Sequence, residues 1–392
     1  MPWNETSPMN QRTQFIADHL GAHYSHSELC ELYGISRKTG YKWIARYEEA
    51  GPQGLLELSS RPHHSPNKTP EEIEQLILAL RHKHPSWGAK KLLPSLERRH
   101  PQIEFPSCST VSDILSRNDM ITPKRRRRPI GHPGKPNRVA QAPNSIWTAD
   151  FKGHFKTGDG HYCYPLTVTD RYSRFLLGCQ GLYTTSPVKA KPVFTRLFKE
   201  YGLPDVIRTD NGVPFATTTL ARLSSLSAWW VRLGIIPELI EPGKPQQNGQ
   251  HERMHRTLKA ETTRPAAHSL GAQQRRFNRF REEYNHERPH EALEQNIPAS
   301  LYQPSPREMP NKIPPLEYPD HFEKRYVSTN GGMRWNSGWV AVSIVCEGEY
   351  VGLEEVDEGI WNVYFGPIRL GRLIEQHMRI EDQYGKLKRR NV

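Results

Sequence analysis

Three acidic residues stand where this sequence could build a metal-dependent site. Asp150 lies in the apolar run 147–151, Asp210 directly follows the run 206–209, and Glu252 lies early in a predicted helix. Carboxylates in or beside apolar strands repel one another and lose hydration, and a divalent cation held between them relieves both costs. Oxygen ligands with open coordination positions suit Mg²⁺ or Mn²⁺, and two such ions can activate a water or a hydroxyl for phosphodiester chemistry. Any one acid taken alone is more simply a turn residue, so the prediction depends on all three.

Two other aspartates are predicted to be simple turn residues. Asp159 stands in Gly158-Asp159-Gly160, and Asp170 follows a predicted strand. We expect both to be turn residues, because aspartate commonly begins turns by binding its own backbone.

The predicted helix over 247–261 adds cations to the candidate site. Glu252, His255, Arg256 and Lys259 recur at helical spacing and are predicted to share one face. A metal-binding carboxylate beside phosphate-binding cations fits nucleotidyl transfer, although a surface ion-pair face has the same pattern.

The same helix contains a rival motif. His251-Glu252-Arg253-Met254-His255 is an H-E-x-x-H string, which in a metalloprotease supplies two zinc ligands and a general base. A second copy at 286–290 contains Pro289, which would break the helix that the motif needs. Proteolysis leaves the nucleic-acid features described next unexplained, so a zinc protease is the minor alternative.

The elements before the acids are predicted to be helical and basic. Apolar spacing predicts helices over 9–20, 25–33 and 36–49, the order of a helix-turn-helix within 1–60. A second helical block, also similar to a helix-turn-helix, is predicted over 69–120. An αα-hairpin with a solvated basic face is the simpler alternative for the first block. The candidate DNA contacts on the third helix are Arg37, Lys38, Thr39, Lys42 and Arg46.

A basic linker is predicted over 121–143, where Pro and Gly prevent regular structure. It contains no acidic residue, so it could neutralise phosphates or enter a minor groove, although such runs are as often solvated linkers. Its candidate DNA-binding residues are Lys124, Arg125, Arg126, Arg127 and Arg128.

The pattern changes to α/β over 144–305, where three successive strands followed by a helix and a strand predict a mixed sheet. Short alternating runs over 320–376 predict a small β-barrel, and a basic tail follows at 377–392. The core strands are expected over 146–152, 161–169, 174–182, 205–209 and 236–240, and its helices over 187–201, 218–233, 247–261 and 275–285.

Composition narrows the class of protein further. The 392 residues include 54 Lys and Arg against 42 Asp and Glu, a formal charge of +12 that favours a polyanionic partner. No apolar run approaches 18 residues, which argues against a membrane span. The five cysteines form no C-x-x-C pair, so no disulfide framework or cysteine zinc site is predicted. We expect a cytoplasmic protein that associates with the nucleoid through DNA.

Four motifs resemble those of the D-D-E transposases of bacterial insertion sequences and of retroviral-type integrases. The resemblance covers residues 140–305 in detail and implies an RNase H-like core that uses Mg²⁺, or Mn²⁺, with Asp150, Asp210 and Glu252 as the catalytic, metal-binding triad. One departure is the spacing of 41 residues between Asp210 and Glu252, which is longer than the family commonly has. The motifs are Trp147-Thr148-Ala149-Asp150-Phe151, Thr209-Asp210-Asn211-Gly212 with Pro214-Phe215, Gln247-Asn248-Gly249 with Glu252, and Tyr284-Asn285 with Arg288-Pro289-His290.

The resemblance implies a polynucleotidyl transferase that binds the terminal inverted repeats of a transposon as a homo-oligomer on double-stranded DNA. Water and then the freed 3′ hydroxyl would attack phosphodiesters, giving 3′-end cleavage and strand transfer, while Arg256 and Lys259 hold DNA beside the triad. Two alternatives stay open: a transposase-derived DNA-binding regulator that has lost catalysis, and a plain RNase H-like nuclease.

Overall fold

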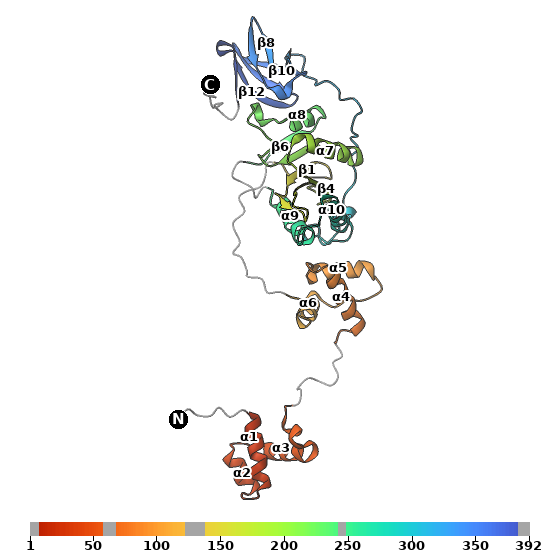
Figure 1. The fold of residues 1–392 in the computed structure, drawn as a ribbon, viewed down its shortest axis with the longest axis vertical. Helices are drawn as coiled ribbons and strands as arrows, with labels where there is room; N and C mark the ends of the chain where they lie inside the picture. The colour runs from red at the N-terminus through yellow and green to blue at the C-terminus, as the bar shows by residue number, and fades with distance from the viewer. Residues whose placement is uncertain (1–7, 58–67, 122–137, 242–247, 383–392) are drawn as a thin grey trace. The chain divides into compact units, whose positions relative to one another are not determined.

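The computed structural model describes residues 8–57, 68–121, 138–241 and 248–382 (Figure 1). The predicted arm contacts Lys124, Arg125, Arg126, Arg127 and Arg128, the opening of the helix at Gln247 and most of the basic tail lie outside these residues. The chain forms two compact units, 1–70 and 71–392.

The first unit is a small helical bundle. Ser25 and Ser36 cap the second and third helices, which places both helix starts where the sequence predicts them. Gly34, at φ +63°, makes the turn between them, and a side chain at Gly40 would come within 2.6 Å of the Cys30 sulfur. The close packing of the last two helices therefore requires glycine at position 40. The elements are α1 (Pro8–Leu20), α2 (His26–Leu32), α3 (Arg37–Ala50) and the 3₁₀ turn η1 (Gly51–Leu55).

The second unit begins with the predicted second helical block. Its own core is built around Trp87, Leu92 and Ile114, all fully buried. Ser107 caps the third of its helices by accepting a hydrogen bond from Thr110 N. The helices are α4 (Glu71–Lys83), α5 (Ala89–Arg99) and α6 (Cys108–Arg117).

A mixed sheet follows, as the strand order in the sequence predicts. Its strand order is β2-β3-β1-β5-β6, with β4 paired to β3. The first strands are antiparallel, whereas β1 pairs with β5 and β5 with β6 in parallel. The strands are β1 (Ile146–Phe151), β2 (Phe155–Lys156), β3 (Tyr162–Asp170), β4 (Leu176–Leu182), β5 (Val206–Thr209) and β6 (Ile236–Leu239).

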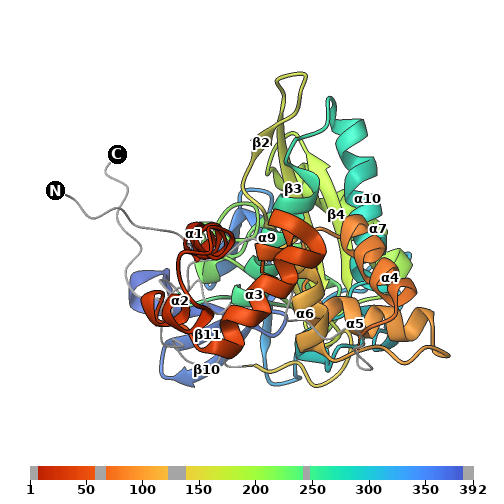
Figure 2. The same ribbon diagram turned by 90° about the horizontal axis from the view of Figure 1, so that it is seen from below.

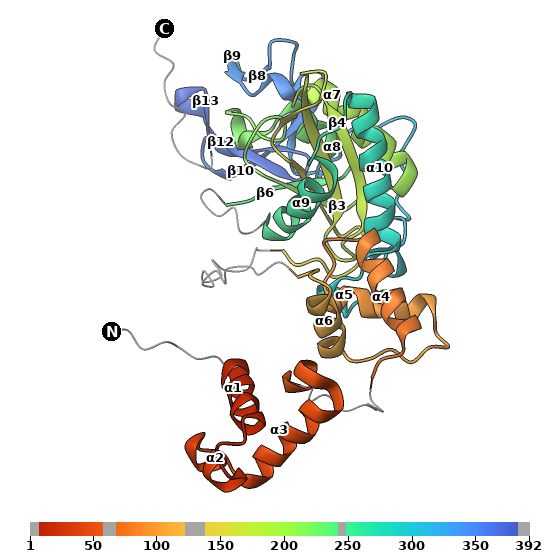
Figure 3. The ribbon, with the colours of Figure 1, turned by 60° about the horizontal axis from the view of Figure 1, so that its bottom comes forward.

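Helices cover both faces of this sheet (Figures 2 and 3). On one face Trp147 and Ala149 of β1 pack with α7 (Pro187–Tyr201) and α8 (Ser225–Arg232). On the other face α9 (Gly249–Thr262) and α10 (Leu270–His286) lie against β3 and β4. Because strand side chains alternate, Thr148 and Asp150 point away from Trp147 and Ala149, toward α9.

The helix predicted over 218–233 is shorter in the structure. A 3₁₀ turn, η2 (Leu220–Arg222), precedes it, and α8 begins only at Ser225. Ser224 and Ser227 form a reciprocal capping box that starts the helix there. Ala216 and Leu223 pair in a β-bridge, so the chain between them forms a loop that contains η2 instead of the first turns of an α-helix.

The predicted C-terminal β-barrel is wrong in its closure. The described strands form an open five-stranded antiparallel sheet, β13-β12-β11-β10-β7, and a separate two-stranded hairpin, β8-β9. The buried residues of these strands pack in one cluster with Leu220 and Val231 of the mixed-sheet region. This packing covers one face of the open sheet. The strands are β7 (Glu323–Tyr326), β8 (Gly332–Trp335), β9 (Gly338–Ala341), β10 (Tyr350–Asp357), β11 (Ile360–Phe365), β12 (Ile368–Ile374) and β13 (Arg379–Asp382).

Within the described residues, no helix combines the length and the apolar character that a membrane crossing requires.

Candidate active site

The three predicted acids come from three adjoining elements. Asp150 lies near the end of β1, and Asp210 immediately follows β5, the parallel neighbour of β1. Glu252 lies in the first turn of α9, which packs against the β1 and β3 face. The carboxyl ends of parallel strands meet at one edge of a sheet, so β1 and β5 bring the two aspartates to the same edge.

The electrostatics of Asp150 reflect this arrangement. Burial, followed by the charge of Asp210 and then that of Glu252, raises the pKa of Asp150 to about 7, against the opposing effects of a backbone N–H and Lys152. Burial also raises the pKa of Asp210, although its carboxylate accepts a hydrogen bond from Gly212 N. The two other carboxylates are thus close enough to Asp150 to disfavour its ionised form.

The two predicted turn acids behave differently. Asp170 is fully buried, but its carboxylate accepts hydrogen bonds from Asn144 N, Ser173 N and the Ser173 hydroxyl at 2.6–2.8 Å. Asp159 accepts from Thr157 and from His161 N. Asp159 and Asp170 each bind donors of their own turn, as predicted, and Asp170 also binds the distant Asn144 N. Neither acid therefore needs a cation, unlike Asp150 and Asp210.

Carboxylate oxygens at a sheet edge are suitable ligands for Mg²⁺ or Mn²⁺. In the part of the chain that the structure describes, no three His, Cys, Asp or Glu side chains lie close enough together to hold a metal ion. The acids therefore share an electrostatic environment without forming a closed ligand cage, and the metal-binding role of Asp150, Asp210 and Glu252 stays a prediction.

The predicted cationic face of α9 needs one correction. Glu252, Arg256 and Lys259 are exposed, whereas His255 is only 4% exposed and lies against the sheet. Burial lowers the pKa of His255, with smaller effects of His251 and Lys152, so this imidazole is neutral. Arg256 and Lys259 remain predicted DNA contacts, but His255 is not a third cation.

A buried hydrogen-bond network joins α9 to the strand that carries Asp150. Both His251 and His255 place Nε2 on the Thr167 hydroxyl, at 2.6 Å and 2.7 Å. His251 Nδ1 also lies 2.9 Å from the hydroxyl of Thr148, two residues before Asp150. Sequence reasoning missed this network, although the i, i+4 histidines and the threonines of two neighbouring strands were its visible signals.

This network also weighs against a zinc protease. Both ring nitrogens of His251 contact threonine hydroxyls, and Glu252 between the two histidines is exposed. In the second H-E-x-x-H string, α10 ends at His286 itself, so the two histidines do not share a helix.

The fourth sequence motif fixes α10 and α9 in place. Asn285 accepts a hydrogen bond from Leu176 N and donates one to Leu176 O, which fastens the end of α10 to β4. Arg288, nearly buried, donates to Glu261 near the end of α9 at 3.0 Å. These motif residues therefore position the helix that carries Glu252.

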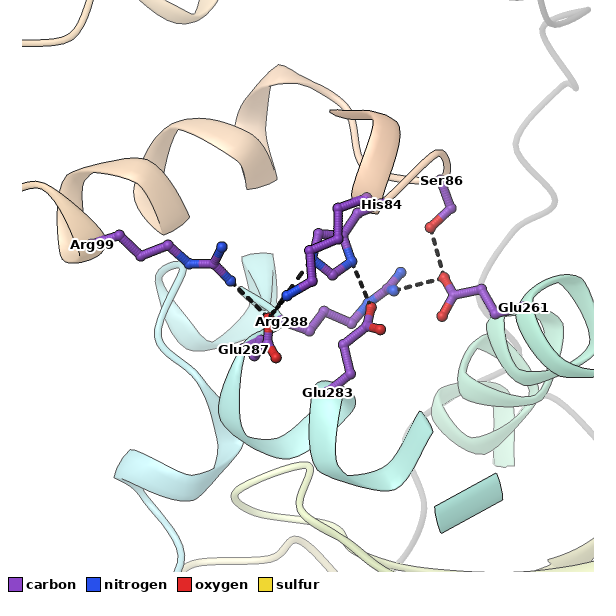
Figure 4. Close-up of polar contacts among 8 residues, drawn as sticks. His84, Ser86, Arg99, Glu261, Glu283, Glu287 and Arg288 are labelled. Carbon is purple, nitrogen blue, oxygen red and sulfur yellow. Dashed lines mark hydrogen bonds and ion pairs between the residues drawn. The ribbon is translucent and has the colours of Figure 1, made fainter. Parts of the chain in front are cut away.

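The helical block 71–120 contacts the same two helices through polar groups (Figure 4). Ser86 donates to Glu261 at 2.6 Å, and His84 Nδ1 lies 2.9 Å from Glu283. Glu287 pairs with Arg99 at 2.7 Å and with Lys83 at 3.0 Å. The ends of α9 and α10 distant from Glu252 are thus held by the helical block that precedes the mixed sheet.

The predicted DNA contacts on α3 fall into two groups. Arg37 and Lys38 are exposed, and both are free to reach a phosphate or a base edge. Thr39 is half-buried and its hydroxyl contacts the capping Ser36 at 2.9 Å. Lys42 and Arg46 lie over the Trp43 ring, at 4.7 Å and 5.1 Å from its centroid. Three of the five residues therefore also support the fold.

Family models match most of these regions. Residues 11–63 match a helix-turn-helix domain and residues 39–115 a homeodomain-like domain. Two integrase core domain models match residues 140–245 and 233–298.

Similar proteins come from insertion elements and retroviruses. An insertion element IS407 uncharacterized 31.7 kDa protein of Burkholderia multivorans is 24% identical over 286 residues, which span 71% of this chain and 90% of that protein. The Gag-Pol polyprotein of feline leukemia virus is 27% identical over 206 residues, 50% of this chain but only 11% of the polyprotein.

Two solved structures are similar as well. The HTLV-2 integrase catalytic core domain in complex with magnesium is 15% identical, with a TM-score of 0.34, and covers 42% of this chain and 100% of its own. A chain of the simian T-cell lymphotropic virus intasome in complex with a PP2A regulatory subunit is 15% identical, with a TM-score of 0.37, over 70% of this chain and 97% of its own.

Proposed function

We infer that this chain, which belongs to the integrase-core superfamily of insertion elements and retroviral-type integrases, is a DNA transposase that cleaves the 3′ ends of its element and transfers them to target DNA. What supports the proposal is the surroundings of Asp150 on β1, whose pKa is raised first by burial and then by the charges of Asp210, which follows β5, and Glu252 on α9.

In the proposed reaction each residue has a distinct task. Asp150, Asp210 and Glu252 hold a divalent cation, Mg²⁺ or Mn²⁺, which when bound supplies Lewis acidity for in-line phosphoryl transfer. Arg256 and Lys259, exposed one and two turns beyond Glu252 on α9, hold the DNA backbone beside the acids. The Thr167 network and the Arg288–Glu261 pair keep α9 in register with the sheet.

We further propose that α3 and the helical block 71–120 bind the terminal inverted repeats, and that the basic arm 124–128 adds salt-dependent affinity. Two DNA ends must be joined to one target, so a homo-oligomer on DNA is expected. Such an enzyme would work at the nucleoid.

A cleavage and joining assay tests this function. The purified chain is mixed with labelled DNA that carries the element's own end, in Mg²⁺, in Mn²⁺ or in EDTA. We expect nicking at the end and strand-transfer products with either metal, and loss of both in EDTA. A scrambled end sequence is the control, and it should be neither bound tightly nor cut. Tight, specific binding without cutting under every metal condition would contradict the proposal and favour a regulator that has lost catalysis.

The raised pKa of Asp150 predicts how the metal-free protein responds to pH. The pKa rises from its ordinary 3.8 to about 7 because of burial and the neighbouring acids. Between these values the native state keeps a proton that the unfolded state has lost, so the free energy of unfolding falls as pH rises from about 4 to 7. We expect Asp150→Asn in EDTA to remove this slope and to raise the Tm at pH 8 by roughly 2–4 °C. Thermal unfolding of both proteins between pH 5 and pH 8 checks this, and equal slopes would contradict it.

A further inference from the structure

The chain between Asp210 and α8 takes an unusual course. It turns at η2, where Ala221 and Arg222 have φ angles of +52° and +56°. Residues that carry a Cβ rarely adopt this left-handed conformation, so two in succession need neighbours that hold them there. The turn lies within the 41 residues that separate Asp210 from Glu252, the spacing in which this sequence departs from its relatives.

Contacts on both sides of η2 hold this turn in place. Thr217 N donates to the main-chain carbonyl of Arg222 at 3.1 Å, and the Thr217 hydroxyl donates to that of Leu223 at 2.6 Å. Leu220 and Leu223 are only 5% and 3% exposed, because they pack in the cluster of buried residues that the C-terminal strands form. A turn that is fixed in this way presents the Arg222 side chain in a definite direction.

The Arg222 guanidinium reaches back to the residue that follows Asp210. Its Nη1 donates to Asn211 Oδ1 at 3.2 Å, and Asn211 Nδ2 donates to the main-chain carbonyl of Ile240 at 2.8 Å. Since arginine only donates and a carbonyl only accepts, these two contacts fix which end of the amide is the oxygen. Ile240 directly follows β6, so the Asn211 side chain joins η2 to the end of the strand beside β5.

The Asp210 side chain itself is held by its own turn. Among the described residues its carboxylate accepts one hydrogen bond, from Gly212 N at 3.2 Å. We propose that Arg222 is a positioning residue for Asp210, because it fixes the Asn211 side chain and thereby the main chain that carries the acid. The inference rests on the proposed function, in which Asp210 is one of three essential acids, and it adds a residue that lies outside the four sequence motifs.

Two measurements on the full-length chain test this role. Hydrogen exchange followed by mass spectrometry, without DNA or metal, reports how firmly the segment 208–214 is held. Single-turnover cleavage at saturating DNA reports the chemical step separately from binding. The variants are Arg222→Ala, Asn211→Ala and the two together. Arg232→Ala is the matched control, because this arginine also joins the core to the C-terminal region but pairs with Glu349, at 2.8 Å, and not with Asn211.

We expect Arg222→Ala to exchange faster over 208–214 and to cleave about 10- to 100-fold more slowly, while its affinity for the DNA end changes less than about twofold. Asn211→Ala should show a similar loss, and the double variant no more than the larger single loss, because both substitutions break the same contact. Arg232→Ala should match the wild type in exchange and in cleavage.

Wild-type exchange or wild-type cleavage in Arg222→Ala would overturn the positioning role and leave the proposed function standing. Losses that multiply in the double variant would overturn it as well, since the two residues would then act independently. Absence of cleavage by the wild type with either metal would overturn the proposed function and the role of Arg222 in it. Asn211→Ala breaks the contact from its other side, so a decisive result remains if Arg222→Ala does not fold.

Discussion

Replacing Asp150 by Asn, Asp210 by Asn or Glu252 by Gln is expected to lower DNA cleavage by at least about 10³-fold while binding of the DNA end changes less than about twofold. Each amide keeps the size of the acid but loses the charge that the cation needs. A metal ion contributes several kcal/mol to phosphoryl transfer, and each 1.36 kcal/mol is a factor of ten in rate. The helices that are proposed to bind the DNA end contain none of these three residues, so end binding has no reason to fall.

The measurement pairs a cleavage assay with a binding assay on the same labelled DNA. Asp159→Asn is the matched control, because this acid has the same chemistry but holds only a surface turn through Thr157 and His161 N. It should cleave within about twofold of the wild type. If all three variants of the triad lost binding together with cleavage, the purely catalytic role would be refuted. Wild-type cleavage by any one of them would remove that residue from the site.

The same three substitutions are also expected to leave the stability of the protein unchanged or to increase it. Burial and, after it, repulsion by Asp210 and Glu252 raise the pKa of Asp150, and each amide variant relieves part of this cost, so none should be less stable than the metal-free wild type. Loss of activity in a protein with an unchanged or raised Tm would separate a catalytic effect from an unfolding effect.

The parts of the fold that could be predicted are the helices and strands that have a local sequence pattern. Alternation along a strand over 146–152 separates Trp147 and Ala149 from Thr148 and Asp150, and in the structure the first pair lies in the core while Thr148 contacts His251 of α9. Helix starts at Ser25 and Ser36 were readable because a capping hydroxyl leaves a local signal. The acid-bearing motifs each lie beside such an element.

The parts that could not be predicted depend on pairing between distant segments. The alternating pattern in 320–376 is equally compatible with a barrel and with an open sheet. A barrel closes only when its first and last strands pair, and the alternation of apolar residues does not specify which strands pair. The sheet instead packs with Leu220 and Val231 of the preceding region.

His255 illustrates the same limit at the site. Helical spacing groups it with Glu252, Arg256 and Lys259, but spacing alone does not say where the edge of the covered face falls. In the structure His255 lies on the face of α9 that the sheet covers. It is therefore a neutral hydrogen-bond partner of Thr167 and not the cation that the spacing predicts. Its chemistry depends on residues more than 80 positions away in the sequence.

Replacing Arg37 and Lys38 together by Ala is expected to weaken binding of the DNA end by at least about 30-fold, with little change in Tm. Both side chains are exposed at the start of α3, where a recognition helix contacts the major groove. Charged contacts to phosphates or bases contribute about 1–3 kcal/mol each when lost, and each lost phosphate contact lowers the slope of log K against log salt by about 0.9. The expected slope change for two phosphate contacts is therefore about two.

Titrations of labelled DNA at several salt concentrations measure both quantities. Lys42 and Arg46 are poor choices for this test, because their contact with Trp43 would mix lost stability into the result. The matched control is Arg275→Ala with Arg279→Ala, an exposed pair on α10 that removes the same charge. If the control weakened binding as much as the α3 variant, net charge alone would explain the loss and α3 would not be the recognition helix. A loss confined to the α3 variant, and larger for the element's own end than for a scrambled sequence, requires direct contact between this helix and the DNA.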